Sequence, residues 1–526
     1  MKFIIEDKCR IFTWFFFQRR YMQNSEVESV VENVGKKLYG YQKRALETIF
    51  NKIIDKKEGF NLLYQLPTGG GKTVIFAEIT RRFIEETGKK VLILTHRIEL
   101  CAQTSNMLSE FGVKNKIINS KVKELPDQKD FTCFVAMVET LNNRLQDEEF
   151  EINDIGLVII DEAHYNSFRK LFKYFEQGII LGVTATPLSS NIRLPMNENY
   201  DELIVGESIS TLIEQEFLAR AETYGYNVSL KSLKIGINGD YTVGSSEKLY
   251  SDYPMQEKLL YAYEENCKGK KTLIFNNGIK TSKNVLLTFE EAGYEIKHLD
   301  NTNTAKERKD ILHWFKTKPD AILTSVSILT TGFDEPTVES IILNRATKSL
   351  TLYFQMIGRG SRVTKTKSRF VVIDLGNNAS RFGYWEEGID WQRIFLFPEH
   401  YYESLLTDEE IERHLKYVMP REVRERFANS ESIKFDMRKH YDTAIKTGKR
   451  PKFALDLSLD QHHTMCLENS KDHSEAIDLI ELLQGQIEDR LRQYSYCICK
   501  STPNYIKWLV EDYSRKLRVS LSDKYE

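Results

Sequence analysis

A glycine-rich turn between an apolar run and a helical pattern is the strongest chemical feature of the sequence. Residues 62–65 (LLYQ) lead through Leu66 and Pro67 into Thr68-Gly69-Gly70-Gly71, and Lys72-Thr73 open the next segment. Glycines let backbone N–H groups turn inward around phosphates, and a helix N-terminus adds positive dipole. We predict a phosphate loop in which Lys72 neutralises the β- and γ-phosphates of ATP and Thr73 holds Mg²⁺. Leu66 departs from the general pattern, which has a glycine there.

Two adjacent carboxylates form the second chemical feature. The apolar residues 157–160 (LVII) are followed by Asp161, Glu162, Ala163 and His164. Ligands gather at the carboxyl ends of parallel strands, so this pair is expected beside the phosphate loop. We predict that Asp161 holds the water shell of Mg²⁺ and that Glu162 orients and deprotonates the attacking water. His164 is a candidate for coupling this site to the second half of the chain.

The elements that must position these residues read as two α/β units. Short apolar runs at 91–94, 157–160 and 179–183 predict buried parallel strands, with helical stretches such as 74–87 between them. A second unit has predicted strands at 271–275, 321–324, 340–343 and 370–374. Residues 226–251 are polar and contain three glycines, so we predict that they link the two units as a hinge. The predicted divisions are residues 1–37, an N-terminal extension; 38–206 and 207–395, two α/β domains; and 396–526, a helical accessory region.

The sequence of the C-terminal region predicts helices. Thr407 and Glu410 have the spacing of a capping box, and a helical face is formed by Ala476, Ile480, Leu483, Ile487 and Leu491. Its basic pairs, such as Lys449-Arg450, are more typical of a solvated face than of a nucleic-acid contact.

Composition excludes several classes of protein. The 526 residues are 41% hydrophobic and 29% charged, which suits three or four globular domains. The net charge of −2 gives no overall basic excess, so any nucleic-acid binding must use local patches. The seven cysteines form no C-x-x-C pair, so we expect no zinc site. We expect these cysteines to be reduced thiols in a cytoplasmic protein. No run is long enough to span a membrane. Residues 11–17 (IFTWFFF) predict a short strand or helix, or a start codon placed too early, and no signal peptide.

Taken in order, the motifs resemble those of the superfamily 2 helicases of the DEAH type. The matching segments are 38–42 (LYGYQ), 66–73, 95–100 (THRIEL), 161–164 (DEAH), 184–186 (TAT), 273–276 (LIFN), 327–334 (SILTTGFD) and 355–362 (QMIGRGSR). The resemblance extends over residues 38–391 and implies two RecA-like domains with ATP in the cleft between them.

The resemblance also implies roles for single residues. Gln42 would read adenine, Gly332 and Asp334 would approach the nucleotide, and Arg359 and Arg362 would act as arginine fingers. Coupling between hydrolysis and strand movement would fall to His164, Thr184, Thr186 and Gln355. Candidate contacts to nucleic acid are His96, Arg97, Thr140, Asn276 and Thr324, of which Thr140 and Thr324 are equally compatible with capping local structure.

Further residues resemble those of superfamily 2 helicases in the restriction and DNA-repair branch, and those of RadD-like helicases in particular. They are His96-Arg97-Ile98-Glu99-Leu100, Gln103, Gly239-Asp240-Tyr241, and residues 371–378 (VVIDLGNN) with Arg381, Gly383 and Trp391. We therefore expect an ATP-dependent DNA helicase or translocase acting on single-stranded or branched DNA. The alternatives are an RNA helicase and an ATP-gated DNA clamp or remodeller that does not unwind strands.

Overall fold

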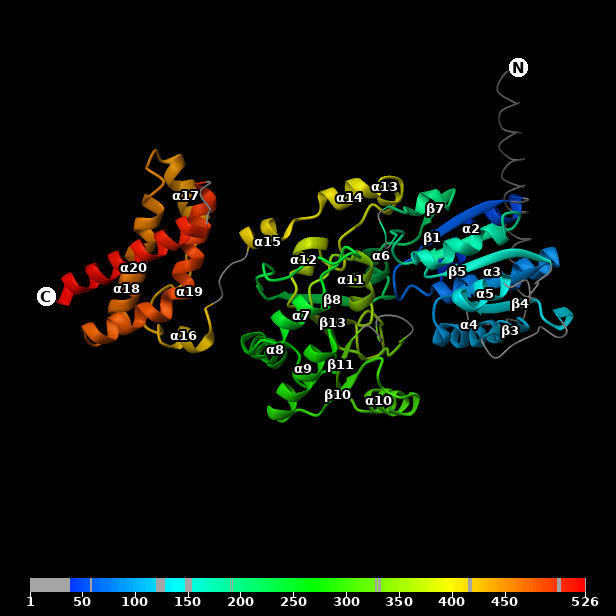
Figure 1. The fold of residues 1–526 in the computed structure, drawn as a ribbon, viewed down its shortest axis with the longest axis horizontal. Coiled ribbons are helices and arrows are strands. Elements are labelled where there is room, and N and C mark those ends of the chain that lie inside the picture. Colours follow the sequence, from blue (N-terminus) through cyan, green and yellow to red (C-terminus); the bar gives the residue numbers. More distant parts are fainter. Residues whose placement is uncertain are drawn as a thin grey trace, which may run out of the picture.

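The chain folds into two parallel sheets and a helical C-terminal region (Figure 1), which confirms the predicted fold class. The computed structural model describes residues 38–56, 59–119, 128–146, 154–189, 191, 193–326, 329, 333–414, 419–498 and 503–525. The predicted extension 1–37, its apolar run at 11–17, and Gly332 lie outside these residues. No helix among the described residues is long and apolar enough to cross a membrane.

The first sheet has the strand order β3-β4-β2-β5-β6-β1-β7 and is parallel throughout. Its strands are β1 (Phe60–Gln65), β2 (Lys90–Thr95), β3 (Asn115–Ile118), β4 (Cys133–Met137), β5 (Ile155–Asp161), β6 (Ile179–Thr184) and β7 (Glu202–Val205). The helical elements around them are α2 (Gly40–Asp55), α3 (Lys72–Thr87), α4 (Ile98–Glu110), η1 (Gln128–Asp130), α5 (Val138–Gln146), η2 (Asn166–Tyr174), η3 (Met196–Glu198) and α6 (Ile209–Glu214). Because β5, β6 and β1 are neighbours, the residues that follow them meet at one edge of the sheet.

The second sheet has the order β10-β11-β9-β12-β13-β8 and is also parallel. Its strands are β8 (Arg220–Gly225), β9 (Thr272–Asn276), β10 (Ile296–Leu299), β11 (Ile322–Val326), β12 (Ser340–Asn344) and β13 (Arg369–Asp374). The helices of this unit are α7 (Val243–Tyr250), α8 (Tyr253–Asn266), α9 (Ile279–Glu291), α10 (Ala305–Thr317), α11 (Leu350–Ile357) and α12 (Asn378–Phe382). Strands β9, β11 and β12 are almost wholly buried, as their apolar runs predicted.

The prediction that residues 226–251 link the two units was wrong. Strand β8 at 220–225 already belongs to the second sheet, where it pairs with β13 from Arg369 to Asp374. The polar, glycine-containing segment therefore lies inside the second unit and ends in α7. The error has a physical source, since an edge strand with exposed ends has too little apolar character to be distinguished from a linker.

The C-terminal region begins with α13 (Trp391–Leu396), α14 (Pro398–Ser404) and α15 (Asp408–His414), and the buried side chains of α13 belong to the core of the sheet domains. The helices that follow, seen as a bundle in Figure 1, share a hydrophobic core of their own; they are α16 (Arg421–Glu425), α17 (Met437–Lys446), α18 (Phe453–Asn469), α19 (His473–Cys497) and α20 (Pro503–Tyr525). The predicted apolar face of α19 is fully buried, from Ala476 to Leu491. The predicted capping box is formed, because Thr407 and Glu410 exchange hydrogen bonds at the start of α15.

Candidate active site between the two sheets

The phosphate loop joins β1 to α3, and the side chain of its lysine is hydrogen-bonded to the backbone at the start of the loop. Gly69 and Gly71 have φ values of 93° and 83°, a region that favours glycine. A Cβ on Gly71 would lie 2.4 Å from the Nε2 atom of Gln42, so a side chain there would displace Gln42 from the loop. The Nζ of Lys72 donates to the carbonyl of Leu66 at 3.2 Å. Leu66 itself is fully buried, which shows how a leucine is accommodated where the general pattern has glycine.

Helix α2 packs against the loop through two side chains. The Tyr41 hydroxyl donates to the carbonyl of Gly70 at 2.7 Å, and Gln42 Nε2 donates to the same carbonyl at 3.3 Å. The Oε1 atom of Gln42 accepts from the backbone N–H of Tyr39 at 3.0 Å. Gln42 thus lies beside the phosphate loop, while its role in reading adenine stays a prediction. Sequence reasoning missed the part played by Tyr41.

The two carboxylates stand at the carboxyl end of β5. Glu162 adopts a φ of 54°, and its N–H donates to Asp161 Oδ1 at 3.0 Å. Burial and the neighbouring Glu162 raise the pKa of Asp161 to about 7. Burial is the largest single influence on Glu162 and opposes its ionisation, but Lys72 and further neighbouring groups together outweigh it and lower that pKa. Burial lowers the pKa of Lys72, against the pull of both carboxylates. The phosphate loop and the carboxylates therefore form one electrostatic site.

A chain of hydroxyl groups runs from this site to the second unit. His164 Nδ1 lies 3.0 Å from Thr184 Oγ1 and 3.5 Å from Glu162 Oε2. Thr184 Oγ1 donates to the carbonyl of Thr186 at 3.0 Å. Thr186 Oγ1 then lies 2.8 Å from Thr351 Oγ1 on α11, in the second unit. These coupling candidates are thus connected by hydrogen bonds, through a threonine that the motifs did not indicate.

Tyr165 is a second residue that sequence reasoning missed. Its ring lies between those of His96 and His164, with centroids 4.1 Å and 4.3 Å away. Burial raises the pKa of Tyr165, Glu162 adds to the rise, and a side-chain hydrogen bond with Gln355 opposes it. Burial lowers the pKa of His96 to about 4, so this ring is neutral at pH 7. The aromatic position directly after the carboxylate motif was the available signal for Tyr165.

The second unit brings two arginines to the phosphate loop. Arg362 Nη1 donates to the carbonyl of Gly69 at 2.6 Å, and its Nε donates to Asp334 Oδ1 at 2.9 Å. Arg359 donates to the carbonyl of Phe333. Burial lowers the pKa of Arg359 to about 10, while the negative charge of Glu162 opposes this change. One cleft therefore holds cations from the second unit and carboxylates from the first.

A surface ion pair also holds the two units against one another. Within the second unit, the N–H of Ala219 donates to the carbonyl of Ser361 at 2.7 Å, next to the arginines. Arg308 of α10 lies 3.5 Å from Glu99 of α4. The cleft is therefore in a closed arrangement.

The candidate nucleic-acid residues fall into two groups. His96, Arg97 and Thr140 are half-buried at the carboxyl edge of the first sheet. Asn276 and Thr324 are fully buried, and Asn276 Nδ2 donates to Thr324 Oγ1 at 2.8 Å. This side-chain hydrogen bond joins the end of β9 to the middle of β11, while contact of either residue with nucleic acid stays a prediction.

Fold and site together define a two-domain protein of RecA-like architecture with a nucleotide cleft between the domains. Residues 35–189 match the family model of the type III restriction enzyme, res subunit, and residues 255–364 match that of the helicase conserved C-terminal domain. The chain is a member of the superfamily 2 helicases, in their restriction and repair branch.

Relatives and solved structures agree with this assignment. The chain is 29% identical over 358 residues to the "Putative ATP-dependent helicase IRC3" of Saccharomyces cerevisiae, covering 64% of this chain and 51% of that protein. It is 23% identical over 382 residues to the type I restriction enzyme EcoAI endonuclease subunit of Escherichia coli, covering 65% of this chain and 46% of that one. The chain thus spans about half the length of these two relatives. The DNA-bound type ISP restriction-modification enzyme LlaBIII has the same fold over 94% of this chain and 42% of its own, with a TM-score of 0.50 and 15% identity.

Proposed function

We propose that this chain is an ATP-dependent DNA helicase or translocase of repair or recombination, in which hydrolysis at the cleft drives movement along a strand. The observation that carries the proposal is the contact of Arg362 with the phosphate loop, beside Lys72, Glu162 and Arg359. Cations from one domain and carboxylates from the other suit the cleavage of a bound nucleoside triphosphate, because both domains are needed to surround its γ-phosphate.

The residues present fit ATP with Mg²⁺. The turn at Gly69–Gly71 leaves no room for side chains, and Glu162 Oε2 is a buried oxygen without a hydrogen-bond partner. Such an oxygen can accept a proton from water. Mg²⁺ would screen the charge on the phosphate oxygens, with Thr73 and Asp161 as the residues that would hold it. The raised pKa of Asp161 fits this role, since a cation would return it to the ionised form.

Each remaining group has one task in this proposal. Lys72 binds the β- and γ-phosphates, with the N–H groups around Gly69, Gly70 and Gly71. Glu162, kept ionised by Lys72, orients the water and takes its proton. Arg359 and Arg362 stabilise charge that develops on the γ-phosphate, as a planar guanidinium matches two phosphate oxygens.

Loss of the γ-phosphate would weaken the hold of the arginines and let the domains part. The hydroxyl chain from His164 to Thr351 and the pair Tyr165–Gln355 would carry this change between the domains. DNA as the track is supported by the relatives, whose names include restriction enzymes, and contacts to a strand would go mainly to phosphates.

Parallel measurements of ATP hydrolysis test the proposal. The purified chain is assayed with single-stranded DNA, forked DNA, duplex DNA and RNA, with Lys72→Ala as the control for contaminating ATPase. We expect stimulation by single-stranded or forked DNA and no turnover in the control. Equal stimulation by RNA would favour an RNA helicase, and stimulation without strand displacement would favour a translocase or clamp. An inactive wild-type chain on every nucleic acid would refute the proposal.

A further inference from the structure

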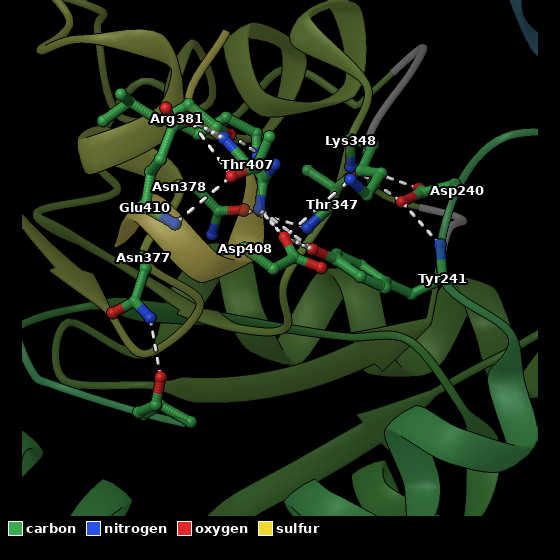
Figure 2. A network of polar contacts seen from close by, with 12 residues as sticks. Asp240, Tyr241, Thr347, Lys348, Asn377, Asn378, Arg381, Thr407, Asp408 and Glu410 are labelled. Carbon is green, nitrogen blue, oxygen red and sulfur yellow. Dashed lines mark hydrogen bonds and ion pairs between the residues drawn. The ribbon is translucent and has the colours of Figure 1, made fainter. Parts of the chain in front are cut away.

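The motif Gly239-Asp240-Tyr241 has no place in the nucleotide cleft, but the structure brings it to the helix that leads to the arginines. Figure 2 shows the Asp240 side chain pointing at the start of α11. Asp240 Oδ1 accepts from the N–H of Lys348 at 2.7 Å, and Oδ2 accepts from Thr347 Oγ1 at 2.7 Å. Arg345 adds an ion pair at 3.6 Å. One carboxylate therefore fixes two consecutive residues ahead of α11.

The same turn is held from the other side. The N–H of Thr347 donates to Asn378 Oδ1 at 2.9 Å, and the N–H of Ser349 donates to Thr347 Oγ1 at 3.0 Å. Ser349 then caps α11 by accepting from the N–H of Leu352. The position of α11 along its axis is therefore set at its N-terminal end.

Helix α11 connects this anchor to the cleft. It runs from Leu350 to Ile357 and carries Thr351, which meets Thr186 of the first domain, and Gln355, which meets Tyr165. Arg359 and Arg362 follow directly after its last turn. Because a helix of eight residues is a rigid rod of about 12 Å, a shift at its start moves both arginines.

The accessory region joins the same network (Figure 2). The Tyr241 hydroxyl donates to Asp408 Oδ1 at 2.6 Å, and Arg381 donates both to Asp408 and to the Tyr241 hydroxyl. The Nζ of Lys348 lies 3.8 Å from the same Asp408 oxygen. Asp408 is the first residue of α15. It therefore attaches the C-terminal region to Tyr241, the neighbour of Asp240, and to Lys348, which Asp240 also contacts.

We propose that Asp240 is a positioning residue for the arginine motif, and that Asp408 attaches the C-terminal helical region to the same anchor through Tyr241, Arg381 and Lys348. Asp240 touches no part of the nucleotide cleft and acts through α11. The inference rests on the proposed ATPase function, and it assigns the Gly-Asp-Tyr motif a task within that function.

Steady-state ATP hydrolysis by the full chain, with saturating single-stranded DNA, tests the role of Asp240. In Asp240→Ala we expect kcat to fall by about 10²-fold, as for an ångström-scale misplacement of a catalytic group, with KM for ATP changed less than about threefold. Asp240→Asn should keep kcat within about threefold of wild type, because its amide can still accept from Lys348 and donate to Thr347. Asp252→Ala is the matched control, since Asp252 caps α8 in the same domain without touching α11. It should leave kcat unchanged.

A double-mutant cycle separates positioning from general loss of stability. In an Arg359→Ala background, Asp240→Ala should lower kcat by clearly less than the about 10²-fold expected in the wild type, because one of the two arginines that Asp240 positions is already gone. Full additivity would overturn the proposal, as would an active Asp240→Ala. If Asp240→Ala does not fold, Thr347→Val removes one of the two contacts and should show the same non-additivity.

Asp408→Ala tests the second half of the proposal. It should lower kcat in the same direction, by about threefold to tenfold, and non-additively with Asp240→Ala. An unchanged kcat would remove the C-terminal region from this network. A wild-type chain without ATPase activity would refute the proposed function, a result distinct from an active wild type that tolerates Asp240→Ala.

Discussion

Replacing Glu162 by glutamine should separate ATP binding from ATP hydrolysis. The substitution keeps the size and shape of a half-buried side chain that carries one buried oxygen without a hydrogen-bond partner, so packing is preserved. It removes the carboxylate whose ionised form is favoured by the charges of Lys72 and Arg359. Removing a general base costs about 10²–10⁴ in rate, which is about 3–5 kcal/mol of transition-state stabilisation. The loss of one negative charge beside Lys72 should leave ATP affinity equal or higher.

The assay combines equilibrium binding of a fluorescent ATP analogue with turnover in the presence of single-stranded DNA. Glu162→Gln should bind the analogue at least as tightly as wild type and hydrolyse ATP at least about 10²-fold more slowly. Glu198→Gln is the control, because Glu198 is an exposed residue of the same domain that pairs with Arg169. It should change neither quantity. Turnover by Glu162→Gln within tenfold of wild type would refute the assignment of Glu162 as the base.

Three further predictions concern other parts of the molecule. Arg362→Ala should lower kcat/KM for ATP by about 10³-fold or more, whereas Arg369→Ala, at an exposed pair of the same domain, should change it less than twofold in the same ATPase assay. Thr351→Val removes the hydrogen bond to Thr186, which is worth about 1 kcal/mol. It should reduce the stimulation of hydrolysis by DNA about fivefold, with KM for ATP unchanged. Stimulation equal to that of the wild type would contradict the coupling path. Burial lowers the pKa of His462 well below its ordinary value. Below about pH 6.5 the unfolded chain therefore binds a proton that the folded bundle excludes. The free energy of unfolding should fall as the pH drops below about 6.5, by up to about 1.4 kcal/mol per pH unit. Hydrogen exchange in the bundle measures this slope, which His462→Gln should flatten.

Patterns that depend on short-range chemistry were predictable from the sequence. The apolar runs marked the buried strands β2, β5, β6, β9 and β12, and the glycine-rich turn marked the start of α3. The burial of these strands on both faces makes their composition nearly uniform, so single-sequence reasoning finds them. The edge strand β8 lacked this signal, and the segment 226–251 was therefore misplaced between the domains.

Contacts between distant elements were not predictable in the same way. Thr351 lies one helical turn before Gln355, but its partner Thr186 is 165 positions away, and only the closed cleft brings them together. Asn276 and Thr324 lie within two buried strands, and whether such residues face a ligand or each other depends on rotamers that a pattern does not encode. The network of Asp240, Tyr241, Lys348 and Asp408 likewise joins three segments far apart in the sequence.

Affinity for a transition-state analogue tests the shared nucleotide cleft most directly. Binding of ADP alone and of ADP with fluoroaluminate is measured for wild type and for Arg359→Ala, in the presence of Mg²⁺ and single-stranded DNA. If the second domain donates its guanidinium to the γ-phosphate position, the wild type should bind the analogue at least 10²-fold more tightly than ADP, and Arg359→Ala should lose that difference while ADP affinity is retained. Equal preference for the analogue in both proteins would contradict a cleft completed by the second domain.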